Sequence, residues 1–97
     1  MIEKSGIELI IEERVKQIAK YHYHGMHDVL YTNKELLFAA LAYLNEALYG
    51  GNVGIEDWPW DIKYFKNEGY IESLKKAGAL IAAELDRIQL EKDENTD

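Results

Sequence analysis

The residue types best suited to chemistry in this 97-residue sequence are three histidines and an aspartate that lie close together. They are His22, His24, His27 and Asp28, in the pattern H-x-H-x-x-H-D. Imidazoles two positions apart point to the same side of an extended chain, and together with a carboxylate they can bind zinc. One interpretation is therefore a zinc-binding module. The other is a group of partly exposed histidines in a polar connection, because loose motifs of this kind often occur by chance.

Acidic residues on the expected helices suggest a second chemistry. Helical pyrophosphohydrolases of the MazG-like type bind Mg²⁺ through several inward-facing carboxylates, which grip the phosphates of a nucleoside triphosphate. Glu13, Glu35 and Glu84 are the candidate ligands here, but Lys16 stands where the third acid of the E-E-x-x-E motif belongs. The alternative is that these carboxylates lie on solvated helix faces and at helix ends.

A third candidate is the aromatic segment W-P-W-D, which contains Trp58, Trp60 and Asp61. Large aromatic rings bind partners and stack on bases, but they also dominate protein cores. The segment is therefore either a binding site for a partner or ligand, or a loop that its rings hold against the core.

These residues must be positioned by helices, of which the central one is the most clearly marked. Residues 32–49 are apolar on almost every side, which predicts that neighbouring elements cover this helix on several sides. Thr32 and Glu35 form a capping box at its start, with Asn33 as a competing cap, and Gly50 and Gly51 supply a residue that can end it in a left-handed conformation.

Two further helices are predicted before and after it. Residues 7–20 carry an apolar stripe, which we expect to pack on the central helix, and residues 70–91 form the longest helix. Gly78 within that last helix predicts a close approach of another helix, since glycine otherwise costs about 1 kcal/mol of helix propensity. Lys75, Lys76 and Arg87 are expected to form exposed ion pairs. The apolar stripe of the first helix consists of Ile7, Ile11, Val15 and Ile18, and the seam of the last consists of Ile71, Leu74, Gly78, Ile81, Leu85 and Ile88.

Two connections complete the predicted chain. Residues 21–31 lose the helical period and are read as irregular. Residues 50–69 contain too much aromatic area for a free loop, so we expect them to fold back on the bundle with a short helical turn after Pro59. The predicted fold is all-α, a small bundle of three main helices with a Trp-rich connecting segment. Residues 1–90 form one domain, and residues 91–97 form a disordered acidic tail.

Composition narrows the classes of function. The net charge of −7 would repel a phosphate backbone, so we expect no nucleic-acid partner. The chain has no cysteine, which excludes disulfides and thiolate chemistry. It shows no secretory signal and no apolar segment of the roughly 20 residues that cross a membrane. A cytoplasmic protein without membrane contact is therefore expected.

The sequence also resembles a group of small phage and prophage proteins of unknown function. The resemblance covers most of the chain and begins with E-R-x-x-Q-I at residues 13–18. It continues through H-D at residues 27–28, a helix with E-L, A-A and Y, and W-P-W at residues 58–60. It closes with K-A-G-A-L-I-x-A-E-[IL]-[DE]-R at residues 76–87. The resemblance implies a phage or mobile-element origin and a helical fold, but no activity.

Together these observations favour a non-catalytic helical protein of phage or prophage type that acts through a protein partner or as a homodimer along its last helix. No cofactor is expected on this hypothesis. The first alternative is a diverged MazG-like, Mg²⁺-dependent nucleoside triphosphate pyrophosphohydrolase that uses Glu13, Glu35 and Glu84. The second is the zinc-binding module formed by the histidines.

Overall fold

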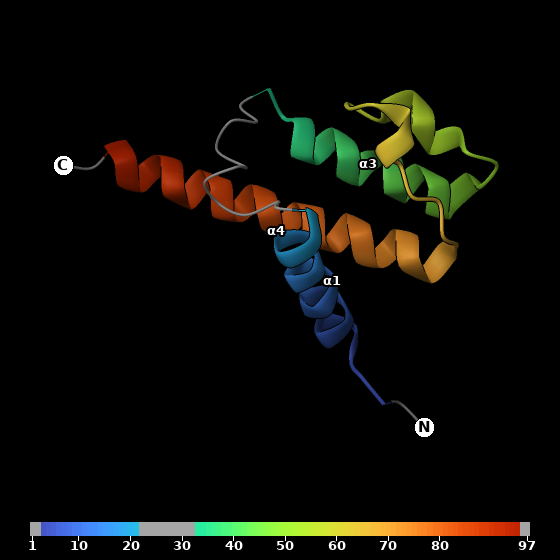
Figure 1. The fold of residues 1–97 in the computed structure, drawn as a ribbon, viewed down its shortest axis with the longest axis horizontal. Helices are drawn as coiled ribbons and strands as arrows, with labels where there is room; N and C mark the ends of the chain where they lie inside the picture. The colour runs from blue at the N-terminus through green and yellow to red at the C-terminus, as the bar shows by residue number, and fades with distance from the viewer. Residues whose placement is uncertain (1–2, 22–32, 96–97) are drawn as a thin grey trace.

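Three α-helices form the body of the part of the chain that the structure describes. The structure is a computed structural model that describes residues 3–21 and 33–95. Two short 3₁₀ helices lie in the connection between the second and third α-helices (Figure 1). The predicted all-α fold with three main helices is confirmed. The elements in chain order are α1 (Gly6–Tyr21), α3 (Glu35–Tyr49), η1 (Val53–Asp57), η2 (Ile62–Tyr64) and α4 (Tyr70–Asn95).

The ends of α3 agree with the prediction at Gly50 and differ at the start. Gly50 has a φ of 68°, and its N–H donates to the carbonyl oxygen of Glu46 at 2.9 Å, so it ends the helix as expected. At the start, Lys34 is the N-cap residue and makes no side-chain capping bond. The Glu35 carboxylate instead accepts the N–H of Asn33 at 2.8 Å. Thr32, the other predicted capping residue, lies outside the described residues.

Helix α4 is longer than predicted. It continues to Asn95, so the segment from residue 91 that was expected to be a disordered tail is helical as far as that residue. Arg87 and Glu91 form an i,i+4 ion pair of 2.6 Å across the predicted boundary, which supports the additional turn.

The core lies between α3 and α4. Small side chains on both helices allow close packing, and the aromatic connection covers this cluster from one side. The segment therefore folds back as predicted, and η2 is the short helical turn expected after Pro59. The buried cluster consists of Leu36, Ala39, Ala40, Tyr43, Ala77, Leu80 and Ala83, with Trp58, Trp60 and Phe65 packed against it.

Helix α1 packs mainly on α4, so the prediction that it packs on the central helix was wrong (Figure 1). Gly78 permits this contact. A Cβ atom at Gly78 would lie 2.7 Å from Cδ1 and 2.9 Å from Cγ1 of Ile10, which is closer than side chains normally approach. The prediction that Gly78 marks a close helix approach is confirmed, and the approaching helix is α1.

The apolar stripes of α1 and α4 lie mostly at the surface, although the sequence predicts that they face the core. The stripe of α1 is 39–65% exposed, whereas Glu13, Arg14 and Gln17 of the same helix are buried. The central helix also leaves an apolar stripe at its surface, so it is not covered on as many sides as predicted. Most of the predicted seam of α4 is exposed as well. The exposed residues of α3 and α4 include Leu37, Leu41, Leu44, Leu48, Ile71, Leu74, Ile81 and Leu85.

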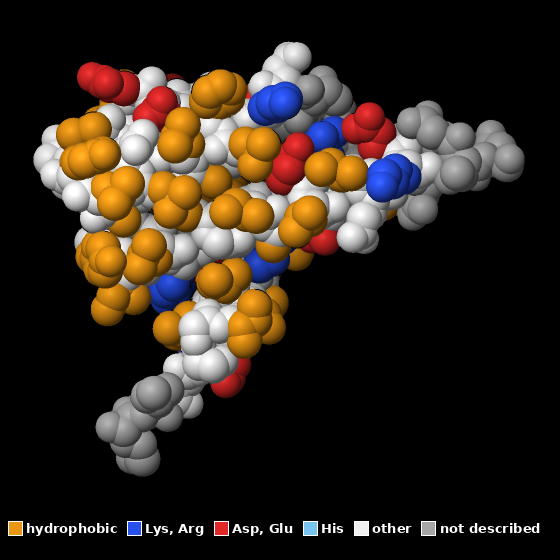
Figure 2. Space-filling view, turned by 180° about the vertical axis from the view of Figure 1, so that it is seen from behind, with side chains coloured by type: hydrophobic (Ala, Val, Ile, Leu, Met, Phe, Trp, Pro, Cys, Tyr) orange, Lys and Arg blue, Asp and Glu red, His pale blue; other side chains and the backbone are white. Residues whose placement is uncertain are grey.

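Figure 2 shows one face of the molecule on which hydrophobic side chains gather over α3 and α4 and continue along α1. Despite this apolar surface, none of the helices described in the structure has the length and apolar character needed to span a lipid bilayer.

Gly54 provides a test of the fold. A Cβ atom there would overlap the carbonyl oxygen of Ala42 and lie 2.9 Å from its carbonyl carbon. Since backbone atoms cannot move aside cheaply, we expect Gly54→Ala to lower the free energy of unfolding by about 2 kcal/mol, measured by urea denaturation. The control is Gly6→Ala, which would meet nothing within 4 Å and should be neutral or slightly stabilising. An unchanged stability of Gly54→Ala would contradict the described contact between η1 and α3.

Candidate functional site

The three glutamates proposed as Mg²⁺ ligands lie in separate environments. Glu84 accepts from Arg87 Nε at 2.7 Å and Nη2 at 3.0 Å, and Glu35 accepts the N–H of Asn33. Glu13 lies beside Lys16 and Lys76. Over residues 3–21 and 33–95, no group of three or more His, Asp or Glu side chains is arranged to hold a metal ion. The Mg²⁺-dependent alternative therefore stays a prediction.

The structure does not test the zinc-binding alternative. His22, His24, His27 and Asp28 all lie outside the described residues, so their arrangement stays a prediction.

The W-P-W segment is held against the body by its rings. Trp58 packs edge-on against Tyr43, with centroids 5.4 Å apart, and against Trp60 at 5.3 Å. Its indole N–H donates to the carbonyl oxygen of Asp61 at 2.9 Å, and the Asp61 carboxylate accepts the N–H of Lys63 at the start of η2. Both tryptophans remain half-buried, so their rings hold the loop in place and also reach the surface.

A pocket lies where α1 meets this aromatic segment. Its cavity volume is about 40 Å³. The empty volume is about 420 Å³ if the solvent at its mouth is counted. It combines polar side chains of α1 and α4 with an aromatic wall. The lining residues are Glu13, Gln17, Tyr43, Trp58, Tyr64, Lys66, Lys76 and Leu80.

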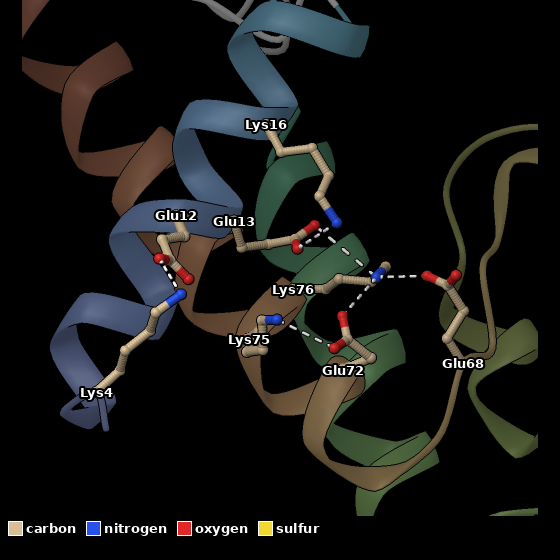
Figure 3. Close-up of polar contacts among 8 residues, drawn as sticks. All are labelled: Lys4, Glu12, Glu13, Lys16, Glu68, Glu72, Lys75 and Lys76. Carbon is tan, nitrogen blue, oxygen red and sulfur yellow. Dashed lines mark hydrogen bonds and ion pairs between the residues drawn. The ribbon is translucent and has the colours of Figure 1, made fainter. Parts of the chain in front are cut away.

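Two of the lining residues, Glu13 and Lys76, belong to a network of charged side chains, which Figure 3 shows. Glu13 is 1% exposed, and its two carboxylate oxygens lie 3.5 Å from Lys16 Nζ and 3.8 Å from Lys76 Nζ. Lys76, itself 5% exposed, also contacts Glu68 at 2.7 Å and Glu72 at 3.6 Å. The predicted exposed ion pair at Lys76 was therefore wrong, because this lysine is buried among three carboxylates from α1, α4 and the preceding loop.

The network keeps Lys76 charged. Burial lowers the pKa of Lys76, but the hydrogen bond to Glu68 and the charges of Glu13, Glu68 and Glu72 outweigh it, so the pKa is raised. The hydrogen bond from Lys76 in turn lowers the pKa of Glu68. Both groups are thus ionised at neutral pH, and the contact with Glu13 joins α1 to α4 through opposite charges.

Two buried oxygen atoms at the pocket have no hydrogen-bond partner among the described residues. They are Oε1 of Glu13 and Oε1 of Gln17, one helical turn apart on α1. Leaving a buried acceptor without a donor costs about 1–3 kcal/mol. Both atoms are closed off from the pocket's open space, and Glu13 Oε1 keeps its ion-pair contact with Lys16 at 3.5 Å.

Sequence reasoning missed the buried polar residues, although a signal for them existed. Glu13, Arg14 and Gln17 belong to the E-R-x-x-Q-I motif, and Lys76, Glu84 and Arg87 belong to the closing motif of the same resemblance. Apart from Asp86, which is exposed, the charged letters of both motifs thus mark positions that the fold buries. Glu46 gave no such signal. It is a buried structural acceptor for the N–H groups of Asn52 and Gly54.

Comparison of the chain with known protein families, with curated proteins and with solved structures finds no match. Any functional conclusion therefore depends on the geometry described above.

The contact between Glu13 and Lys76 can be tested by substitution. Lys76→Met removes one of the two cations beside a buried carboxylate, so we expect it to lower the free energy of unfolding by about 3 kcal/mol. The double variant Glu13→Gln/Lys76→Met should cost less than the sum of the single variants, because the charge left behind is removed as well. Urea denaturation at one fixed protein concentration measures all three.

The matched control is Lys75→Met on the same helix. Lys75 contacts Glu72 at 3.0 Å close to the surface, and its loss should cost less than about 1 kcal/mol. Equal effects of the two lysine substitutions, or additive effects in the double variant, would contradict the described pairing.

Proposed function

We propose that this chain is a non-catalytic helical protein that acts through protein contacts and forms a homodimer through its exposed apolar stripes. The orientation of α1 carries the proposal. An amphipathic helix in a self-sufficient domain turns its apolar side inward. Here α1 presents Ile7, Ile11, Val15 and Ile18 to the surface and buries its polar side.

The energetic cost of this arrangement in a lone chain is large. Burying a side chain such as isoleucine instead of leaving it in water stabilises by roughly 1.5–3 kcal/mol. Complete burial of the four partly exposed aliphatic residues would therefore add several kcal/mol of stabilisation. The total stability of a domain is of the order of 5–15 kcal/mol. A second protein surface that covers the stripe would recover this energy.

A second copy of the chain offers a matching surface. In a symmetric dimer the same patch must be self-complementary. The stripe Ile7, Ile11, Val15 and Ile18 of α1 has spacings of three and four, and so does the stripe Leu37, Leu41, Leu44 and Leu48 of α3. Each runs about 16 Å along its helix, at a rise of 1.5 Å per residue. In such a dimer α1 of each copy packs along α3 of the other copy, so two equivalent contacts cover the stripes of both helices in both copies.

Sedimentation velocity of the full chain tests the proposal. We expect the protein to sediment with twice its chain mass of 11.2 kDa at micromolar concentrations and near-physiological salt. Ile11→Arg should weaken the dimer by about 30-fold or more, because it places a charge in the centre of the contact. Arginine makes the net charge of −7 less negative, so a loss of association cannot result from added repulsion between copies.

The matched control is Gln89→Arg, which makes the same charge change at an exposed position of α4 outside the stripes. This variant should associate as the wild type does. A strictly monomeric wild type at high concentration, or an Ile11→Arg variant that associates as well as Gln89→Arg, would overturn the proposed homodimer.

A further inference from the structure

We propose that α1 is a detachable helix, which a cluster of six charged side chains holds on α4 at neutral pH and releases in acid. The packing of α3 on α4 would stay in place when α1 is released. The inference goes beyond the proposed homodimer, because every contact that it uses lies within one chain.

Helix α1 contributes little to the buried apolar core. Every side chain of the buried cluster, and every aromatic ring packed against it, comes from α3, from α4 or from the segment between them. The described residues that α1 buries are Glu13, Arg14 and Gln17, which are all polar. Because proteins open locally where few apolar contacts are buried, we expect α1 to separate from the rest of the chain first.

Six charged side chains meet where α1 packs on α4 (Figure 3). Three are carboxylates and three are lysines, so their formal charges sum to zero in a protein whose net charge is −7. Lys76 joins three segments, because its Nζ lies 3.8 Å from a carboxylate of α1, 2.7 Å from one of the preceding loop and 3.6 Å from one of α4. The six are Glu13 and Lys16 of α1, Glu68 of the loop, and Glu72, Lys75 and Lys76 of α4.

The other charged and titratable groups beside Lys76 do not change their charge in acid. Tyr43 of α3 and Tyr64 and Lys66 of the aromatic segment line the same pocket as Lys76. A phenol and an ammonium group are already protonated at neutral pH, so acid leaves their charge as it is. A second ion pair joins the two helices, Arg14 with Asp86 at 3.2 Å, but Asp86 is 53% exposed and such pairs contribute little.

Acid changes the balance of the cluster through two carboxylates outside α1. Hydrogen bonds from Lys76 and Lys75 lower the pKa values of Glu68 and Glu72, respectively. Their contribution to stability is therefore fully present above the ordinary pKa of 4.5 and is lost as the pH falls through the lowered pKa values. The pKa of Lys76 is raised, so this lysine stays charged throughout.

Protonation of Glu68 and Glu72 leaves three lysines and one carboxylate, so the charge of the cluster rises from zero to +2. Lys16 of α1 and Lys76 of α4 then depend on the same carboxylate, that of Glu13. A buried ammonium group with too little opposite charge is costly, and moving α1 away lets water reach it. A detached helix of 16 residues is only marginally stable in water, so its backbone amides would exchange with solvent.

Hydrogen exchange of the full chain, followed by mass spectrometry at pH 7 and at about pH 3.5, tests the inference. Results are expressed as protection factors, which remove the direct effect of pH on the exchange reaction. We expect the protection of α1 to fall roughly tenfold or more in acid, while that of α3 and of the part of α4 packed on it changes less than about twofold.

The double variant Glu68→Gln/Glu72→Gln removes the same two charges at neutral pH. We expect its α1 to be poorly protected at pH 7 and to respond little to further acidification. The matched control is Glu3→Gln/Glu56→Gln, which neutralises two exposed glutamates outside the cluster and should behave as the wild type does. Circular dichroism checks that the variants are folded, and if the first is not, the wild-type measurements decide the question.

Four results would overturn the inference. They are unchanged protection of α1 in acid, loss of protection in all three α-helices together, equal behaviour of the two folded double variants, and a loss confined to dilute protein. The last result would report dissociation of a dimer instead of release from α4, so the wild type is measured at two concentrations. A wild type that is monomeric at both concentrations leaves the expected release of α1 unchanged, which separates this test from that of the homodimer.

Discussion

The buried contact between Glu13 and Lys76 determines which side of α1 faces the rest of the protein. Lys76 lies beside Glu13 at 3.8 Å and beside Glu68 at 2.7 Å, and both Glu13 and Lys76 are almost fully buried. Removing one partner from a buried group of charges is destabilising, and rotating α1 to bury its apolar stripe would take the Glu13 carboxylate away from Lys76. Gly78 reinforces this choice because it lets Ile10 approach α4 closely.

Two surfaces follow from this single orientation. The polar side of α1 closes one wall of a pocket whose other wall is aromatic, and the apolar side is left at the surface. The aromatic wall is itself well anchored, since the rings of Tyr43 and Phe65 stack at 4.8 Å and the Tyr43 hydroxyl accepts the N–H of Lys66 at 2.9 Å. A partly aromatic pocket on one side and an exposed apolar stripe on the other are thus consequences of the same helix packing.

The comparison of sequence and structure shows what a pattern of apolar residues can and cannot predict. Local signals placed the helices well, because Gly50, Pro59 and the spacing of apolar residues act within a few positions of the chain. The partner of α1 was predicted incorrectly, since periodicity identifies an apolar face but does not say whether the same chain or another covers it. The buried position of Lys76 depends on carboxylates from three separate segments, which no local pattern contains. The histidine cluster and the phage resemblance stay predictions.

The central claim is that the apolar stripe of α1 faces outward and is covered by a second copy. Because the chain has no cysteine, Ile11→Cys introduces a single thiol whose rate of alkylation reports its exposure. The account predicts fast alkylation of this thiol in dilute protein and slow alkylation in concentrated protein, with Gln89→Cys fast at both. Slow alkylation of Ile11→Cys at every concentration would mean that its own chain covers the stripe. Fast alkylation at every concentration would mean that no second copy covers the stripe. Each of these two results would contradict the account.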